Sequence, residues 1–225
     1  MEKYNVQNHL FYDGYDLDNR TLGDPDFVKK LLEKVNQSVF NGKGVINIIP
    51  YFRGKDENDG GISGFVLGDN FHFTCHTFSF KKTVFVDYFG DDNKKDIVED
   101  ILLSTFDTKN YDMGSKYVKG NFGKHIIFKA SPLSLEEVIP MVKVILKEIN
   151  MTPIEEMFVK QKNEECFDVL QLIAESHISF HRTGNEMVVD TFSCKNFNVK
   201  KLLELFNLSS DYIEVNRGIK YINNK

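Results

Sequence analysis

The chain has 225 residues, of which 41% are hydrophobic and 27% are charged, and its formal net charge at pH 7 is −5. This composition is ordinary for a globular protein and excludes disordered and collagen-like chains. No apolar run approaches the roughly 18 residues of a membrane-spanning helix, and the polar amino terminus is unlike a secretory signal. Lysine and arginine occur only in short pairs such as Lys81-Lys82, which argues against a nucleic-acid-binding surface. We therefore expect a soluble cytoplasmic protein, with no membrane or nucleic-acid partner, that binds a small molecule.

The three cysteines are interpreted as reduced thiols. Cys75, Cys166 and Cys194 cannot all pair with one another, and none belongs to a Cys-x-x-Cys metal motif. Cytoplasmic proteins keep their cysteines reduced. Any functional cysteine in this chain is therefore expected to act as a thiol.

The first half of the chain has the pattern strand, helix, strands, helix. A strand is expected at His9-Leu10-Phe11, and Asp24-Pro25 suits the cap and first position of a helix with an apolar stripe. Runs rich in β-branched and aromatic residues follow, and the last segment has helical spacing. The expected strands span residues 45–49, 62–67, 71–78 and 84–89, and the closing helix spans residues 94–106.

The second half repeats this pattern. A strand is expected at His125-Ile126-Ile127, and Ser134 with Glu137 forms a capping box for the next helix, although Pro140 is expected to kink that helix or delay its start. Residues 183–186, Thr-Gly-Asn-Glu, are a hairpin turn signal. The expected strands span residues 169–173, 177–180 and 187–192, and the closing helix spans residues 198–206.

A short motif also occurs once in each half. His-x-x-x-His appears as His72 to His76 and again as His177 to His181, and each copy is followed by an apolar stretch that ends in Asp-x-Phe. The chain therefore resembles a tandem duplication. We expect an α+β fold of two repeats, residues 1–112 and 113–225, that form one compact domain. Each repeat is an antiparallel sheet with helices on one face, and the two pack as an α/β/β/α sandwich.

Paired histidines four residues apart are also compatible with a zinc site. The flanking β-branched and aromatic residues favour strands over a helix, however, and no third ligand is evident. We therefore expect no metal.

The second half carries a more specific motif. Residues 174–181 read Ala-Glu-Ser-His-Ile-Ser-Phe-His, and residues 190–194 read Asp-Thr-Phe-Ser-Cys. This closely resembles the bacterial and archaeal S-adenosylmethionine decarboxylase family, whose signature is a Glu-Ser-His step, a second His four residues on, and a Cys after Asp-x-Phe. The specific motif covers about twenty residues, and the spacing from His181 to Cys194 is slightly shorter than the family pattern.

The resemblance implies a self-processing, pyruvoyl-dependent decarboxylase. In that family the serine hydroxyl, here that of Ser176, attacks the preceding carbonyl, here that of Glu175, and the chain is then cut. Ser176 becomes an amino-terminal pyruvoyl group, which is the cofactor and forms a Schiff base with the substrate amine. The residue that matches the family's proton-donating thiol is Cys194, and a free cysteine with a pKa near 8.5 has a proton to give at neutral pH.

The two halves differ from the family pattern in complementary ways. The first half has Phe71 in place of Ser176 and no thiol after its Asp-x-Phe, so it cannot make a pyruvoyl group. It keeps Ser63 and His76, which match the serine and histidine that assist processing in the family, whereas the second half has Asp168 in place of that serine. The resemblance therefore implies one composite site with Ser176 and Cys194 from the second half and Ser63 and His76 from the first. His181 is retained as a further candidate.

The substrate is open at this point. The family pattern has Trp-Pro-Glu just after the second histidine, but no glutamate stands there in either copy. S-adenosylmethionine, whose decarboxylation supplies the aminopropyl donor for spermidine and other polyamines, is the first expectation, and ornithine or arginine is the alternative. A second alternative is an uncut, non-catalytic regulatory homologue. Both a monomer and a homodimer are compatible with the sequence.

Overall fold

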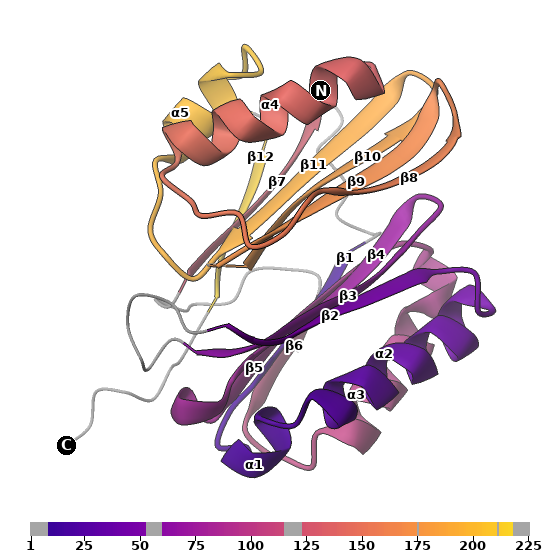
Figure 1. The fold of residues 1–225 in the computed structure, drawn as a ribbon, viewed down its shortest axis with the longest axis vertical. Coiled ribbons are helices and arrows are strands. Elements are labelled where there is room, and N and C mark those ends of the chain that lie inside the picture. Colours follow the sequence, from indigo (N-terminus) through magenta and orange to yellow (C-terminus); the bar gives the residue numbers. More distant parts are fainter. Residues whose placement is uncertain (1–8, 53–59, 115–122, 175, 211, 218–225) are drawn as a thin grey trace. The chain divides into compact units, whose positions relative to one another are not determined.

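The structure is a computed structural model that describes residues 9–52, 60–114, 123–174, 176–210 and 212–217. The chain divides into two compact units, which we call the first unit (within residues 5–116) and the second unit (within residues 117–225). Each unit is described by itself below, with the labels of Figure 1.

The first unit is a six-stranded antiparallel sheet in the order β2-β3-β4-β5-β1-β6. Its main helices, α2 and α3, cover one face of this sheet (Figure 1). Its elements are β1 (His9–Gly14), α1 (Asn19–Leu22), α2 (Pro25–Phe40), β2 (Val45–Phe52), β3 (Gly61–Gly68), β4 (Phe71–Phe78), the 3-10 helix η3 (Ser79–Lys81), β5 (Thr83–Phe89), the 3-10 helix η4 (Asp92–Lys94), α3 (Lys95–Thr105) and β6 (Tyr111–Gly114).

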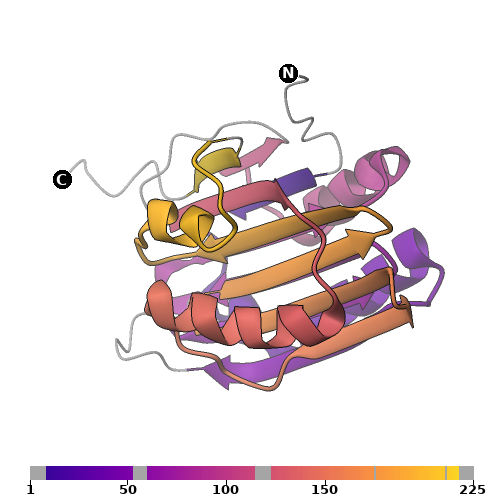
Figure 2. The same cartoon turned by 90° about the horizontal axis from the view of Figure 1, so that it is seen from above.

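The second unit is also a six-stranded antiparallel sheet, in the order β12-β7-β11-β10-β9-β8. Helices α4 and α5 lie over one of its faces, as the view in Figure 2 shows. Its elements are β7 (Gly123–Ala130), α4 (Leu135–Glu148), β8 (Phe158–Asn163), β9 (Cys166–Ile173), β10 (Ser176–Thr183), β11 (Glu186–Ser193), α5 (Val199–Glu204) and β12 (Tyr212–Arg217).

The two sheets have the same topology. Read from its other edge, the first sheet runs β6-β1-β5-β4-β3-β2, and the second runs β12-β7-β11-β10-β9-β8. The strands therefore correspond in pairs, which makes β4 the counterpart of β10 and β5 the counterpart of β11. This equivalence confirms the predicted α+β fold of two similar halves, each an antiparallel sheet with helices on one face.

Local sequence signals set the ends of the long helices. Asp24 caps α2, because its carboxylate accepts a hydrogen bond from the backbone N–H of Asp26 at 3.0 Å. Ser134 and Glu137 form the predicted capping box of α4, which begins at Leu135. Pro140 lies inside α4, so the expected delay of the helix start does not occur.

The helix-covered face of each sheet is apolar. In the first unit, strand residues such as Phe73 and Cys75 share an apolar core with Val35 of α2. In the second unit, Ile178 and Phe180 of β10 belong to the equivalent apolar core. Cys75 is fully buried in this core, and the lost solvation of a thiolate raises its pKa to about 12. Cys75 is therefore a neutral core thiol.

The opposite face of each sheet is buried but polar. Side chains alternate along a strand, so a strand that points apolar residues at its helices presents its other residues on the second face. On β4 these other residues include His72 and His76, and on β10 they include His177 and His181, all of them buried. This alternation places every candidate histidine of the repeated motif on the helix-free side of its sheet.

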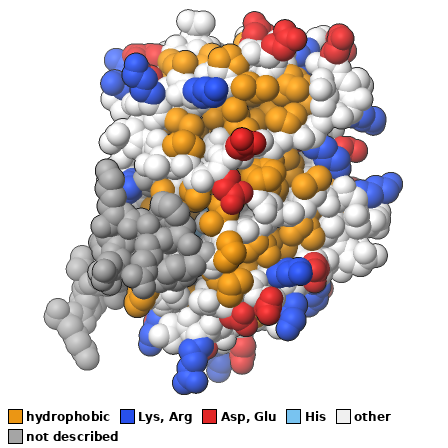
Figure 3. Space-filling model, viewed as in Figure 1, with side chains coloured by type: hydrophobic (Ala, Val, Ile, Leu, Met, Phe, Trp, Pro, Cys, Tyr) orange, Lys and Arg blue, Asp and Glu red, His pale blue; other side chains and the backbone are white. Residues whose placement is uncertain are grey.

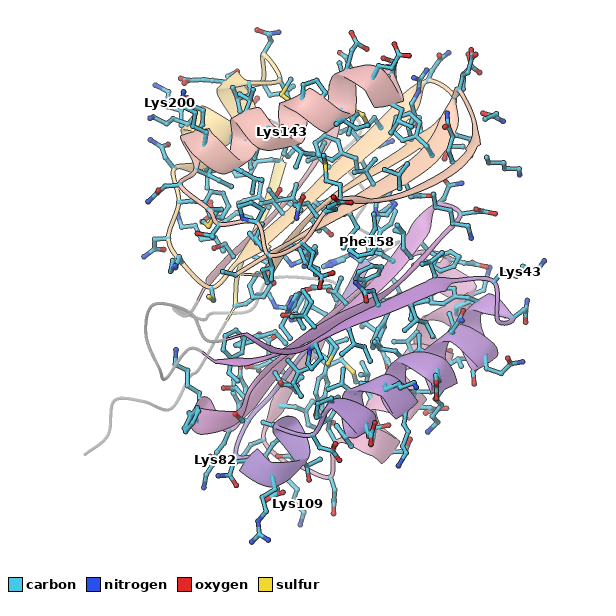
Figure 4. The ribbon with its side chains drawn as sticks, viewed as in Figure 1. Lys43, Lys82, Lys109, Lys143, Phe158 and Lys200 are labelled. Atoms are coloured by element: carbon cyan, nitrogen blue, oxygen red, sulfur yellow. The ribbon has the colours of Figure 1, made fainter. Side chains whose placement is uncertain are left out.

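Charged side chains lie mostly in exposed positions. On the face drawn in Figure 3, lysine and arginine are interspersed with aspartate and glutamate, without a broad region of one sign. The lysines labelled in Figure 4 are exposed and extend from turns and from the outer sides of helices, as Lys143 does on α4. Within the described ranges, no helix has the length and apolar character needed to cross a lipid bilayer.

Candidate active site

Ser176 is the first residue of β10 and is held in an unusual backbone conformation. Its neighbours across the sheet are Ile173 on β9 and Ser193 on β11, and the residue is only 2% exposed. Its φ angle is +151°, whereas the other described non-glycine residues with positive φ have values of 53–61°. Side chains other than glycine rarely adopt a φ near +151°, so the backbone at Ser176 is strained.

The hydroxyl of Ser176 contacts the next side chain along the strand. Its Oγ lies 3.5 Å from Nδ1 of His177, and the other ring nitrogen of His177, Nε2, lies 3.7 Å from Oδ1 of Asp190 on β11. The same carboxylate oxygen lies 2.5 Å from Nε2 of His125 on β7. The sheet creates this cluster because Phe192, two residues after Asp190, is the register partner of both His177 and His125.

An arginine extends the cluster to the edge of the sheet. Arg217 on β12 is fully buried, and its Nη1 lies 3.5 Å from Nδ1 of His125. Its guanidinium also lies 4.6 Å from the centre of the Phe192 ring, within the range of a cation–π interaction. A buried carboxylate requires a compensating positive charge. Arg217 supplies one on the same buried sheet face as Asp190.

Cys194 follows directly after Ser193, the residue that pairs with Ser176. Its side chain is half-buried, and none of the three cysteines forms a disulfide. The turn that carries it is tightly packed, because a Cβ added to Gly123 would lie 2.9 Å from the Cα of Cys194. The hydroxyl of Ser193 also accepts a hydrogen bond from the backbone N–H of Lys195 at 3.0 Å. The predicted nucleophile and the predicted thiol thus lie at the same end of adjacent strands.

Ser63 and His76 form a pair in the first unit. They are register partners on β3 and β4, and Nδ1 of His76 lies 3.0 Å from Oγ of Ser63. At the equivalent positions of the second unit, Asp168 on β9 pairs with His181 on β10, and their side chains are 2.6 Å apart. The alignment of the two halves by sequence therefore agrees with the register of the sheets at both pairs. Glu175, the remaining candidate, lies outside the described residues.

The first unit has no group that could react at the counterpart of Ser176. Phe71 occupies that position, and its ring packs so closely over Gly68 that an added Cβ there would lie 1.6 Å from the ring. The ring also stacks on Phe40 with centroids 3.5 Å apart. An open pocket of about 330 Å³ borders Phe71, and it is lined by Val39, Phe40, Asp69, Asn70, Phe71, Tyr88, Gly90, Asp91 and Lys94.

The residues that follow the second histidine of each motif have structural contacts. Thr77 is buried and donates a hydrogen bond to the carbonyl of Leu22 at 2.8 Å. Arg182 donates to the carbonyls of Leu133 and Gly184 at 2.8 and 3.2 Å. Neither residue is an acid, so neither replaces the glutamate of the family pattern.

Sequence reasoning did not single out four members of this arrangement. Asp190, His125 and His177 belong to patterns that repeat between the two halves, but the patterns assign them no chemical role, and Arg217 belongs to no such pattern. The sequence signal that could have identified Asp190, His125 and His177 is the presence of the same residue types at the equivalent positions of the first half. His9, His72 and Asp87 stand at the equivalent positions, and Nε2 of His9 lies 3.4 Å from Oδ1 of Asp87.

Fold and site together define a duplicated α+β protein in which one half carries a strained Ser-His step and a thiol on adjacent strands. A family model described as S-adenosylmethionine decarboxylase matches residues 8–116 and 132–216, so one segment is matched in each half. The chain belongs to this S-adenosylmethionine decarboxylase family, and the resemblance noted from the sequence is confirmed.

A solved structure of the adenosylmethionine decarboxylase from Aquifex aeolicus VF5 is also similar to this chain. The two share 20% sequence identity over 47% of this chain and 98% of the other, with a TM-score of 0.40. No curated protein matches the chain.

Proposed function

We propose that this protein is a self-processing, pyruvoyl-dependent S-adenosylmethionine decarboxylase whose chain is cut before Ser176. The observation that carries the proposal is the backbone of Ser176, with a φ of +151° at the bond that the family motif marks for cleavage. Strain of this kind costs on the order of 1–3 kcal/mol and concentrates at functional sites. Cleavage before Ser176 removes the constraint, so the strain favours the cut chain.

The residues around Ser176 fit the formation of a pyruvoyl group there. The serine supplies a hydroxyl beside an imidazole, and both are buried. The group would supply a ketone that accepts electrons while carbon dioxide leaves the substrate. Cys194 is the proposed donor of the proton that the substrate α-carbon then takes up, since its half-buried thiol follows the residue paired with Ser176.

Ser63 and His76 are proposed to assist the cleavage. The family uses a serine and a histidine for this task, and Oγ of Ser63 lies 3.0 Å from Nδ1 of His76. His76→Ala is expected to slow cleavage by about 100-fold, the usual contribution of an acid–base group. His181→Ala is expected to slow it less, because Asp168 replaces the serine beside His181. The measurement is the rate at which freshly synthesised chain is cut, and a larger effect for His181→Ala would contradict the assignment.

The substrate is proposed to be S-adenosylmethionine, on the strength of the family. The absence of an acid after His76 and after His181 favours ornithine or arginine as the second candidate. Release of labelled carbon dioxide from each carboxyl-labelled compound distinguishes them. Release from S-adenosylmethionine alone supports the first candidate, and release from a basic amino acid alone replaces it with the second.

The intact mass of the purified chain under denaturing conditions tests the self-processing. Cleavage before Ser176 divides the 26.0 kDa chain into pieces of roughly 20 and 6 kDa, in proportion to 175 and 50 residues. The smaller piece is expected to resist amino-terminal sequencing, because a pyruvoyl group has no amine. A single chain of full mass that also releases no carbon dioxide would favour the regulatory homologue instead.

A further inference from the structure

We propose that His177 is the base that accepts the hydroxyl proton of Ser176 during self-cleavage, and that Asp190, His125 and Arg217 hold it ready for this role. We call these four residues with Ser176 the serine relay. The proposal rests on the proposed function, since it concerns the first step of the cleavage. All five residues belong to the second unit, and all are buried.

The direction of each hydrogen bond follows from the group at the end of the relay. A guanidinium can only donate, so Nδ1 of His125, which lies 3.5 Å from Nη1 of Arg217, must accept. A neutral imidazole that accepts at one nitrogen carries its proton on the other. Nε2 of His125 therefore donates to Oδ1 of Asp190 at 2.5 Å. The buried guanidinium of Arg217 favours the ionised form of this carboxylate.

The same carboxylate favours one tautomer of His177 through its charge, because their separation is too long for a hydrogen bond. Oδ1 of the ionised Asp190 can only accept, so it favours a proton on Nε2 of His177, 3.7 Å away. Nδ1 of His177 is then the accepting nitrogen, and it lies 3.5 Å from Oγ of Ser176. With both histidines neutral, the charges of Arg217 and Asp190 cancel, so the buried cluster carries no net charge. A buried Ser-His-Asp arrangement of this kind activates a serine hydroxyl elsewhere.

The chemical step is a transfer of the acyl group from nitrogen to oxygen. The hydroxyl proton of Ser176 moves to Nδ1 of His177 while Oγ forms a bond to the preceding carbonyl carbon. The carbon–nitrogen bond then breaks, and its nitrogen takes the proton back from His177. The products are an ester and a free amine on residue 176, so atoms and protons balance and His177 is regenerated.

The first unit contains a natural control for this proposal. His72 and Asp87 stand at the positions of His177 and Asp190, and both are buried, but Phe71 replaces the serine. His72→Gln therefore removes the same kind of buried imidazole from the same strand position without removing a base from a reactive hydroxyl. Asp87→Asn is the matching control for Asp190→Asn.

The test measures the first-order rate of cleavage of the full chain after a pulse of cell-free synthesis. His177→Gln is expected to slow cleavage by about 100-fold or more, and His72→Gln is expected to slow it much less. Asp190→Asn is expected to slow cleavage at least about tenfold, because an amide offers N–H groups to His177 and reverses its tautomer. Adding Asp190→Asn to His177→Gln is expected to cause no further loss, since residues that act as a unit are not additive.

Ser176→Cys separates a chemical role of His177 from a structural one. A thiol with a pKa near 8.5 ionises without much help, so it needs a base less than a hydroxyl does. Hydroxylamine cleaves the thioester that forms, and the rate of this cleavage reports the acyl transfer. In the Ser176→Cys background, the loss caused by His177→Gln is expected to shrink at least tenfold. A purely structural role predicts the same loss in both backgrounds.

The outcomes separate this proposal from the proposed function. If the unmodified chain is never cut, both fall. If the unmodified chain is cut, two results would overturn only the base role of His177. One is a cleavage rate of His177→Gln within threefold of the unmodified chain. The other is an equal loss of rate on His177→Gln with serine and with cysteine at position 176. If the double variant loses as much cleavage rate as the product of the two single losses, Asp190 does not act through His177 and is removed from the relay.

Discussion

Ser176→Ala is expected to give a single uncut chain of 26.0 kDa that releases no carbon dioxide from any substrate. The hydroxyl is the proposed nucleophile of the cleavage and the source of the pyruvoyl group, and a methyl group can be neither. Because the hydroxyl is the atom that reacts, the expected loss is complete rather than graded. Mass spectrometry of the denatured chain and a labelled carbon dioxide assay measure the two effects.

A matched control for this change is available on the same strand. Ser179 lies three residues further along β10 and is also fully buried. Ser179→Ala therefore removes a comparable buried hydroxyl but keeps the proposed nucleophile, and it is expected to leave a chain that is still cut. Carbon dioxide release by Ser176→Ala would show that the chemistry does not depend on a pyruvoyl group from this residue.

Cys194→Ala is expected to cleave normally but to decarboxylate about 100-fold more slowly, because the product carbanion loses its proposed proton donor. Cleavage is expected to be unaffected while decarboxylation slows, because the thiol lies beyond Ser193 and outside the serine relay. The cut fraction is measured by mass, and turnover is measured as labelled carbon dioxide per cut chain.

Cys166→Ala is the control for the thiol prediction. Cys166 is also partly buried, but it lies at the far end of β9, paired with Thr183 rather than with a residue near Ser176. Its loss is expected to leave cleavage and turnover unchanged. Full turnover in Cys194→Ala would remove this thiol from the mechanism, and equal losses in both variants would indicate an effect on packing.

Most of the central strands and the long helices could be predicted from the sequence, because several local signals agreed with one another. Alternation and β-branched residues predicted β4 as residues 71–78, and the strand has these bounds in the structure. The Thr-Gly-Asn-Glu signal marked the turn between β10 and β11, where Gly184 has a φ of +59°. Capping residues before α2 and α4 placed the starts of both helices. Such signals depend on only a few neighbouring residues, so a single sequence contains them.

Three of the four edge strands of the two described sheets were not predicted, whereas the edge strand β2 was expected at residues 45–49. β6, β8 and β12 each lie at an edge of a sheet, and their sequences are short or polar, as in Phe158–Asn163 with its four polar residues. An edge strand is defined by backbone pairing with one neighbour rather than by burial of both faces, so it leaves little trace in a hydrophobic pattern. Arg217 was overlooked for this reason, since it lies at the end of β12.

The sequence by itself determined the two similar halves, the family, and the positions of the Glu-Ser-His and Asp-x-Phe motifs, because these depend on residue identity and spacing along the chain. Only the tertiary structure decided which side chains meet. Asp190, His125 and Arg217 are far from one another in the sequence, and antiparallel pairing of β10, β11, β7 and β12 brings their side chains to one buried sheet face. The strained φ of Ser176 likewise depends on its place between two flanking strands. Register across a sheet is set by many distant contacts together, and no local stretch of sequence contains it.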